Sequence, residues 1–153
     1  PGFKYNLTDI AAALGLAQLK KCERFWKGRE HYAALYQEGF QDLPEITCPP
    51  VASHVQHAWH LYVIQLNVDC LRIGRDEFIR QLQQAGVGCS VHFIPLHLHP
   101  YHRDRGGYRP EDFPVASAAF QRIVSLPLYS KMTEDEVNRV IETVHDLVKS
   151  NRR

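Results

Sequence analysis

Residues 10–19 are the most constraining stretch of this sequence, because they are apolar on nearly every side when they are placed on a helix. A helix at a protein surface has a single apolar stripe, whereas a helix that is hydrophobic all round is buried from several directions. The run IAAALGLAQL therefore needs a cover, which must come from other parts of the protein or from a partner.

The apolar run is predicted to begin a long helix over residues 10–40, about 30 residues or ~45 Å in length at 1.5 Å per residue. Thr8 can act as the N-cap, and Asp9 places a carboxylate in the first turn, where the helix dipole favours negative charge. The second half carries one apolar stripe, formed by Phe25, Tyr32, Tyr36 and Phe40. We expect this half to lie at a surface with the stripe facing a core.

The middle of the chain predicts a strand, a helix and a second strand. Residues 58–66 (AWHLYVIQL) are apolar on both faces, which is typical of a covered central strand. Asp76 is predicted to cap a helix that Gly86 stops. Residues 87–93 alternate with period two, as in a strand with one packed face and one polar face. The packed face would carry Val87, Cys89, Val91 and Phe93, and the polar face Ser90 and His92.

The remainder is read as a long loop over residues 94–114, a short helix over 115–122, a strand over 123–128 and a final helix. Thr133 and Glu136 form the capping-box pattern at the start of that final helix. Helices and strands in this order, without an internal repeat, predict an α+β fold with a small antiparallel-type sheet covered by helices.

Composition limits the function classes. The chain has 153 residues with a net charge of +1, so it offers no basic field for nucleic acid, and no apolar run is long enough to cross a membrane. Four cysteines without a CxxC pair fit free thiols in a reducing cytoplasm. Because the chain has no initiator Met and Pro1-Gly2 is typical of an interior turn, we expect a fragment of a longer protein.

Histidines are the first candidates for chemistry, since four of them fall within a short stretch: His92, His97, His99 and His102. Imidazole is a common metal ligand, but a structural zinc site needs four nitrogen or sulfur ligands, and no cysteine completes such a spacing here. We expect no metal site, and we expect one or two of these histidines to line a pocket. An independent His-rich metal-binding module, or a ligand-sensing or dimerisation domain, is the alternative function.

The opening GFKYN offers a second candidate site. Lys4, Tyr5 and Asn6 place an ammonium, a phenol and an amide just before a helix N-terminus, where phosphate is often bound. No Gly-rich phosphate loop, nucleophile elbow or paired-carboxylate pattern occurs, so we expect no complete active site and no catalytic residue in this chain.

Several motifs together resemble one family. The strings PGFKYNLTDIAAALGLAQLKK, HAWHLYVIQL, AGVGCSVHFIPLHLHPYH and FPVASAAFQRIVSLPLYSKMTEDEV occur in the order and spacing of the C-terminal part of the DegT/DnrJ/EryC1/StrS sugar aminotransferases. The opening Lys-Tyr-Asn-Leu-Thr-Asp-Ile is most similar to the branch that includes the UDP-4-amino-4-deoxy-L-arabinose aminotransferase.

This resemblance implies the small C-terminal domain of a fold type I aminotransferase. Members bind pyridoxal 5′-phosphate (PLP) and move an amino group, usually from glutamate, onto a keto sugar nucleotide, and they work as homodimers. The resemblance assigns residues 1–40 to a phosphate-side motif and an interdomain helix, and residues 41–153 to the small α+β domain. The missing large domain would then cover residues 10–19.

The resemblance also implies roles for individual residues. The lysine that carries PLP in a Schiff base lies in the large domain, so this chain alone should be inactive. Lys4, Tyr5 and Asn6 would lie near the cofactor phosphate of the neighbouring subunit, although many relatives have Asn at the position of Lys4 and Arg at that of Asn6. Independently of the resemblance, His92 lies on the polar face of its predicted strand and leads into a proline-containing loop, so His92 and His97 are the expected contacts to the sugar nucleotide.

Overall fold

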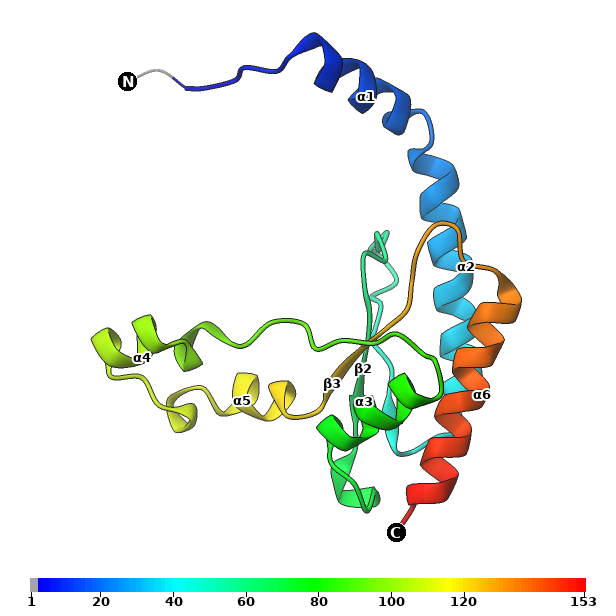
Figure 1. The fold of residues 1–153 in the computed structure, drawn as a ribbon, viewed down its shortest axis with the longest axis vertical. Coiled ribbons are helices and arrows are strands. Elements are labelled where there is room, and N and C mark those ends of the chain that lie inside the picture. The colour runs from blue at the N-terminus through cyan, green and yellow to red at the C-terminus, as the bar shows by residue number, and fades with distance from the viewer. Residues whose placement is uncertain (1–2) are drawn as a thin grey trace.

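A three-stranded antiparallel sheet lies at the centre of the chain in the computed structural model, which describes residues 3–153 (Figure 1). Its strands are β1 (Ile46–Thr47), β2 (Tyr62–Leu66) and β3 (Ile123–Leu126), in the order β1-β2-β3. The predicted α+β class with a small antiparallel sheet is confirmed, and β2 is the central strand as expected, although it begins at Tyr62 and not at residue 58. The interior turn predicted at Pro1 and Gly2 lies outside the described residues.

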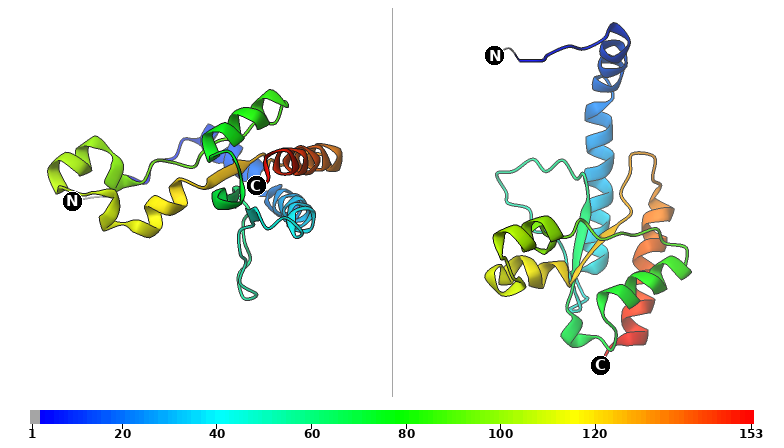
Figure 2. Two further views of the ribbon diagram at one scale, coloured as in Figure 1. Left: turned by 90° about the horizontal axis from the view of Figure 1, so that it is seen from below. Right: turned by 60° about the vertical axis from the view of Figure 1, so that its left-hand side comes forward.

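Two long helices, α2 (Cys22–Phe40) and α6 (Glu134–Asn151), lie side by side against this sheet (Figures 1 and 2). Their close approach depends on Gly39, because a Cβ atom there would lie 2.7 Å from the Cδ1 atom of Ile141. The His145 ring donates a hydrogen bond of 2.7 Å to the Gly39 carbonyl at the same contact. Together these contacts fix the position of α6 on α2.

The core between α2 and the sheet is aromatic. The rings of Tyr36 and Tyr62 lie 4.9 Å apart, and both residues are fully buried. The Tyr36 hydroxyl donates to the carbonyl of Pro127 at 2.8 Å, so its burial leaves no unpaired donor. Burial raises the pKa of both phenols above the ordinary value of 10, which keeps the core uncharged.

The final helix has the N-terminus that its sequence predicts. The Glu136 backbone N–H donates to the Thr133 hydroxyl at 3.3 Å, and the Thr133 N–H donates to the Glu136 carboxylate at 2.8 Å, which is a complete capping box. The backbone hydrogen bond from Thr133 holds the pKa of Glu136 below its ordinary value. The apolar stripe of α6 buries Val137, Val140, Val144 and Val148.

Helix α3 (Arg75–Gln84) begins two residues earlier than the sequence suggested. Gly74 is its N-cap, and Asp76 lies in the first turn and does not cap the helix. Asp76 instead accepts a hydrogen bond from the side chain of Arg75. The predicted stop is confirmed, because Gly86 follows the C-cap with φ +81°, a conformation that favours glycine.

The single helix predicted over residues 10–40 is wrong, because the chain bends at Lys20 and Lys21. Helix α1 (Asp9–Leu19) and α2 are separate, and α1 runs away from the body (Figure 1). Thr8 does cap α1, since its hydroxyl accepts from the Ala11 N–H at 3.3 Å. The two helices differ in burial: α2 packs its stripe on the core, whereas no residue of α1 is buried, so no core contact holds α1 in line with α2.

The strand predicted over residues 87–93 is also wrong. Only Ser90 pairs with the sheet, through two backbone hydrogen bonds to Ser125 of 3.2 and 2.8 Å. Val87 is buried as expected, but Phe93 is 78% exposed and has φ +32°. The chain leaves the sheet after Ser90, so the alternation of side chains does not continue in the structure.

Residues 91–122, which we call the arm, project from the body (Figures 1 and 2). The predicted loop over residues 94–114 contains short helices: η2 (Leu96–Leu98), α4 (Pro100–Gly106) and η3 (Pro110–Asp112). Helix α5 (Pro114–Phe120) then leads back to β3, close to the expected helix over 115–122. The prolines that suggested a loop stand instead at the first positions of helices, where no backbone donor is lost.

A further short helix, η1 (Val68–Cys70), connects β2 to α3. All four cysteines are free, as expected. None of the helices in the described part of the chain combines the length and hydrophobicity that a membrane span requires.

Substitution of two leucines tests whether the core is packed while α1 is exposed. Leu82 is fully buried, whereas Leu14 on α1 is 62% exposed. Leu82→Ala should lower the free energy of unfolding of this chain by about 2–5 kcal/mol, because it removes buried methyl groups and leaves a cavity. The matched Leu14→Ala should change it by less than about 0.5 kcal/mol. Urea unfolding followed by circular dichroism measures both, and equal losses would contradict the fold.

Candidate functional site

The predicted phosphate-side residues lie in an extended segment ahead of α1. Lys4, Tyr5 and Asn6 are all exposed, and the Tyr5 ring stacks on Phe3 with 5.6 Å between ring centroids. Within residues 3–153, no hydrogen bond or ion pair engages these three side chains. The segment therefore presents an ammonium, a phenol hydroxyl and a carboxamide that are free to donate to a ligand.

The two histidines predicted to contact substrate have different surroundings. His92 is exposed on the segment that leads into the arm, with its ring 4.5 Å from that of Phe93. His97 lies in η2 inside the arm, is only 7% exposed and stacks on Phe113 at 4.8 Å. Both residues lie in the arm, but the sequence did not indicate that the His92 ring is exposed and the His97 ring is packed.

The His97 ring is held in one orientation by a chain of hydrogen bonds. Its Nε2 atom lies 3.0 Å from the hydroxyl of Ser117, and that hydroxyl donates to the carbonyl of Pro110 at 2.9 Å. A serine has one hydroxyl proton, so the hydroxyl accepts from His97, which places a proton on Nε2. The Nδ1 atom of a neutral ring is then the acceptor.

The remaining histidines form no cluster. His99 donates from Nε2 to the carbonyl of Ile94 at 3.2 Å, and His57 accepts at Nδ1 from the backbone of Trp59 at 2.9 Å. Among residues 3–153, no three side chains of His, Cys, Asp or Glu are grouped so that they could hold a metal ion.

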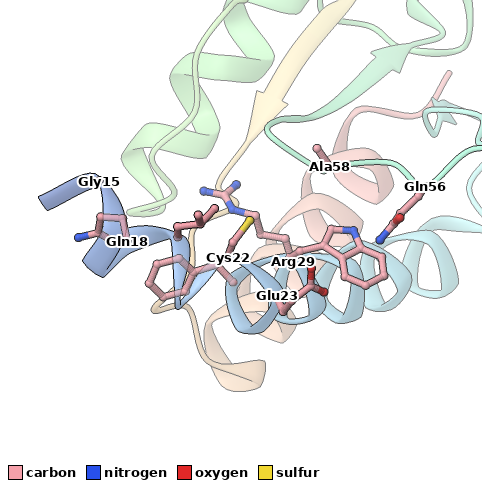
Figure 3. A pocket seen from close by; sticks show the side chains of 10 residues that line it. Gly15, Gln18, Cys22, Glu23, Arg29, Gln56 and Ala58 are labelled. Carbon is pink, nitrogen blue, oxygen red and sulfur yellow. The ribbon is translucent and has the colours of Figure 1, made fainter. Parts of the chain in front are cut away.

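A pocket of about 580 Å³ lies at the bend between α1 and α2, and the sequence did not predict it. Figure 3 shows Gln18, Glu23 and Arg29 from the helices and Gln56 from the loop before β2 around this pocket. The pocket exists because the helix bends, and the helical spacing of the sequence gives no sign of that bend.

Arg29 fixes the wall of this bend pocket. Its Nη1 atom donates to the carbonyls of Trp59, His60 and Leu128 at 2.9, 3.1 and 3.0 Å. Trp59 has φ +49°, which is strained for a bulky side chain. Hydrogen bonds from Arg29 to the Trp59 and His60 carbonyls hold this strained turn against α2.

Helix α1 adds an uncovered apolar surface to the same side of the molecule. Ile10, Leu14, Leu16 and Leu19 are between 62% and 77% exposed, and Phe3, Tyr5 and Leu7 continue the surface before the helix. Contiguous apolar patches of this kind mark interaction sites. The structure thus provides no cover within the described residues for the run that the sequence singled out.

Comparison with known proteins identifies the family. The chain belongs to the DegT/DnrJ/EryC1/StrS aminotransferase family, whose model matches residues 1–145. It is 48% identical over 151 residues to the uncharacterised protein MJ1066 of Methanocaldococcus jannaschii, covering 99% of this chain and 39% of that protein. It is 46% identical over 150 residues to the spore coat polysaccharide biosynthesis protein SpsC of Bacillus subtilis, covering 97% of this chain and 39% of that protein.

Solved structures show the same relationship. Spr1654 from Streptococcus pneumoniae, assigned as a sugar aminotransferase, superposes in its PMP-form with a TM-score of 0.87 at 30% identity, covering 98% of this chain and 37% of that chain. Its PLP-form gives a TM-score of 0.87 at 29% identity. The chain thus spans about two fifths of the length of its relatives, and it corresponds to the C-terminal part of a sugar aminotransferase.

The residues present fit one end of PLP, the cofactor that enzymes of this family bind. A phosphate group accepts hydrogen bonds and carries negative charge, and Lys4, Tyr5 and Asn6 supply a cation and two neutral donor groups in consecutive positions. Their side chains are exposed and free to turn toward such a group. This fit concerns the phosphate group of PLP and no other part of the cofactor.

Proposed function

We propose that this chain is the C-terminal part of a PLP-dependent aminotransferase that moves an amino group from glutamate onto a keto sugar nucleotide for polysaccharide biosynthesis. The observation that carries the proposal is the match to the family over residues 1–145, joined to a free phosphate-type donor set at Lys4 to Asn6. The similarity to SpsC supports a polysaccharide pathway. The proposed enzyme acts in the cytoplasm.

In this proposal PLP, when bound, stabilises the electron pair released at the carbon that gains or loses the amino group. The residues of this chain bind and orient, and none of them is assigned a covalent role. Lys4 neutralises part of the phosphate charge, while Tyr5 and Asn6 donate hydrogen bonds to its oxygens. The lysine that holds the cofactor belongs to a part of the enzyme outside this sequence.

The proposed enzyme is a homodimer in which the Lys4 segment of one subunit reaches the cofactor phosphate of the other. The exposed apolar side chains of α1 support this assembly, because a projecting segment of this kind needs a covering surface. We further assign the chain to the branch of the UDP-4-amino-4-deoxy-L-arabinose aminotransferase. The opening Lys-Tyr-Asn-Leu-Thr-Asp-Ile supports that assignment.

On the substrate side, His92 and His97 are the proposed polar contacts to the nucleotide-linked keto sugar. Two observations support this role. The ring of His92 is exposed and free to contact a ligand, and the ring of His97 is held in place by Ser117 and Phe113. A neutral His92 ring offers one donor and one acceptor to sugar hydroxyls, whereas His97, whose Nε2 proton is engaged by Ser117, offers the acceptor Nδ1.

Lys4→Ala in the full-length enzyme should weaken PLP retention more than it slows turnover with saturating cofactor. A charged hydrogen bond contributes about 1.5–3 kcal/mol, which corresponds to roughly 10- to 150-fold in Kd for PLP. Fluorescence titration of the apoenzyme with PLP measures that constant. Lys131→Ala, which removes an exposed lysine before α6, is the control and should leave the Kd unchanged. An unchanged PLP affinity in Lys4→Ala with collapsed turnover would give Lys4 another role.

His92→Ala and His97→Ala should each lower kcat/KM for the keto sugar by about 2- to 12-fold, the loss expected for one neutral hydrogen bond of 0.5–1.5 kcal/mol. Steady-state kinetics with the keto sugar and glutamate varied separately provide the measurement, and glutamate constants should not change. His54→Ala removes an exposed histidine on the loop before β2 and is the matched control. Wild-type constants for both substrates in both variants would remove these residues from the pocket.

A further inference from the structure

The arm is attached to the body through few contacts at its base. The backbone pair between Ser90 and Ser125 closes the base on one side. A pocket of about 360 Å³ separates the start of the arm at Val91, Phe93 and Ile94 from the side chains of Arg75 and Phe120. Contacts of Arg75 with the residues that line this pocket are therefore part of the attachment of the arm to the body.

Arg75 provides such a contact from the body to the point where the arm returns to β3. Its side chain is only 9% exposed although it is charged, and its Nη1 atom donates to the carbonyl of Phe120 at 3.0 Å. Its guanidinium also lies over the Phe120 ring, 5.2 Å from the centroid, and its Nε atom bonds Asp76 at 2.5 Å. Arg75 thus fixes both the distance and the orientation of Phe120, the last residue of α5, relative to α3.

Helix α5 transmits this constraint to the proposed substrate residues. Ser117, on the same short helix as Phe120, bonds His97 at 3.0 Å and Pro110 at 2.9 Å. Phe113, immediately before α5, stacks on the His97 ring. A continuous path of contacts therefore runs from Arg75 through α5 to His97.

We propose that Arg75 is a positioning residue that sets the orientation of the arm and thereby places His97 for the keto sugar. This inference rests on the proposed function for its kinetic consequence. Arg75 does not touch the substrate; it acts only through α5. A shift of the arm at its base moves α5 and therefore His97, which would lose its hydrogen bond to the sugar.

Arg75→Lys and Arg75→Gln in the full-length enzyme test this role. Both variants remove the planar guanidinium that bonds the carbonyl and stacks on the ring, and lysine keeps the charge. Either variant should lower kcat/KM for the keto sugar by about 2- to 12-fold, as the loss of one imidazole would, with glutamate constants unchanged. In a His97→Ala background the same substitutions should have a smaller effect, because both act through one contact path. Arg139→Lys is the matched control, since its guanidinium bonds the carbonyl of Ala85 at the other end of α3.

Hydrogen exchange separates this inference from the proposed function. In the same Arg75 variants, amides of residues 96–120 should exchange faster than in the wild type, while those of α6 keep their protection. Faster exchange in the arm without any aminotransferase activity in the wild type would overturn the proposed function and leave the anchoring role intact. Unchanged exchange in the arm, or equal kinetic losses for keto sugar and glutamate, would overturn the positioning role of Arg75.

Discussion

The main physical constraint on this structure is that the apolar helix α1 has no covering partner within the described residues. The apolar stripes of α2, α3 and α6 pack around the sheet, but α1 buries no residue. Its exposed leucines and the apolar residues before it would be costly in water, since burying each such side chain contributes about 1.5–3 kcal/mol. The core is therefore built around the sheet, and the apolar surface of α1 stays exposed within the described residues. The chain spans about two fifths of the length of its relatives.

The body and the projections of this molecule have different physical roles. The body is a close-packed core with complete capping at α6 and buried, hydrogen-bonded tyrosines, and it provides a rigid base. The N-terminal segment and the arm project from it and carry the side chains proposed to meet cofactor and substrate. Two arginines at the boundary, Arg29 and Arg75, hold irregular backbone by donating to carbonyl groups. Side chains on such projections can be oriented only if their bases are fixed, and our proposal gives this role at the base of the arm to Arg75.

Elements with a strong local signal could be predicted from the sequence, and those decided by tertiary contacts could not. The capping box at Thr133, the stop at Gly86 and the central strand all follow from residues close in sequence. The bend at Lys20 was not predictable, because both flanking stretches favour helix and only packing distinguishes them. The alternation over residues 87–93 suggested a strand, but a strand also needs a neighbour to pair with, and only Ser90 has one. For the site, residue types identified Lys4, His92 and His97 as candidates, whereas the roles of Arg75 and Ser117 depend on contacts between distant residues.

Trapping of the cofactor with borohydride tests the central claim most directly, namely that this chain contributes to the phosphate side of a PLP site but not the lysine that holds PLP. The purified 153-residue chain and the full-length enzyme would each be mixed with PLP, reduced and mapped by peptide mass spectrometry. The account predicts stoichiometric labelling of one lysine outside this sequence in the full-length enzyme, and no stoichiometric labelling of any lysine in the isolated chain. Stoichiometric labelling of Lys4, or of any other lysine of this chain, in either sample would contradict it.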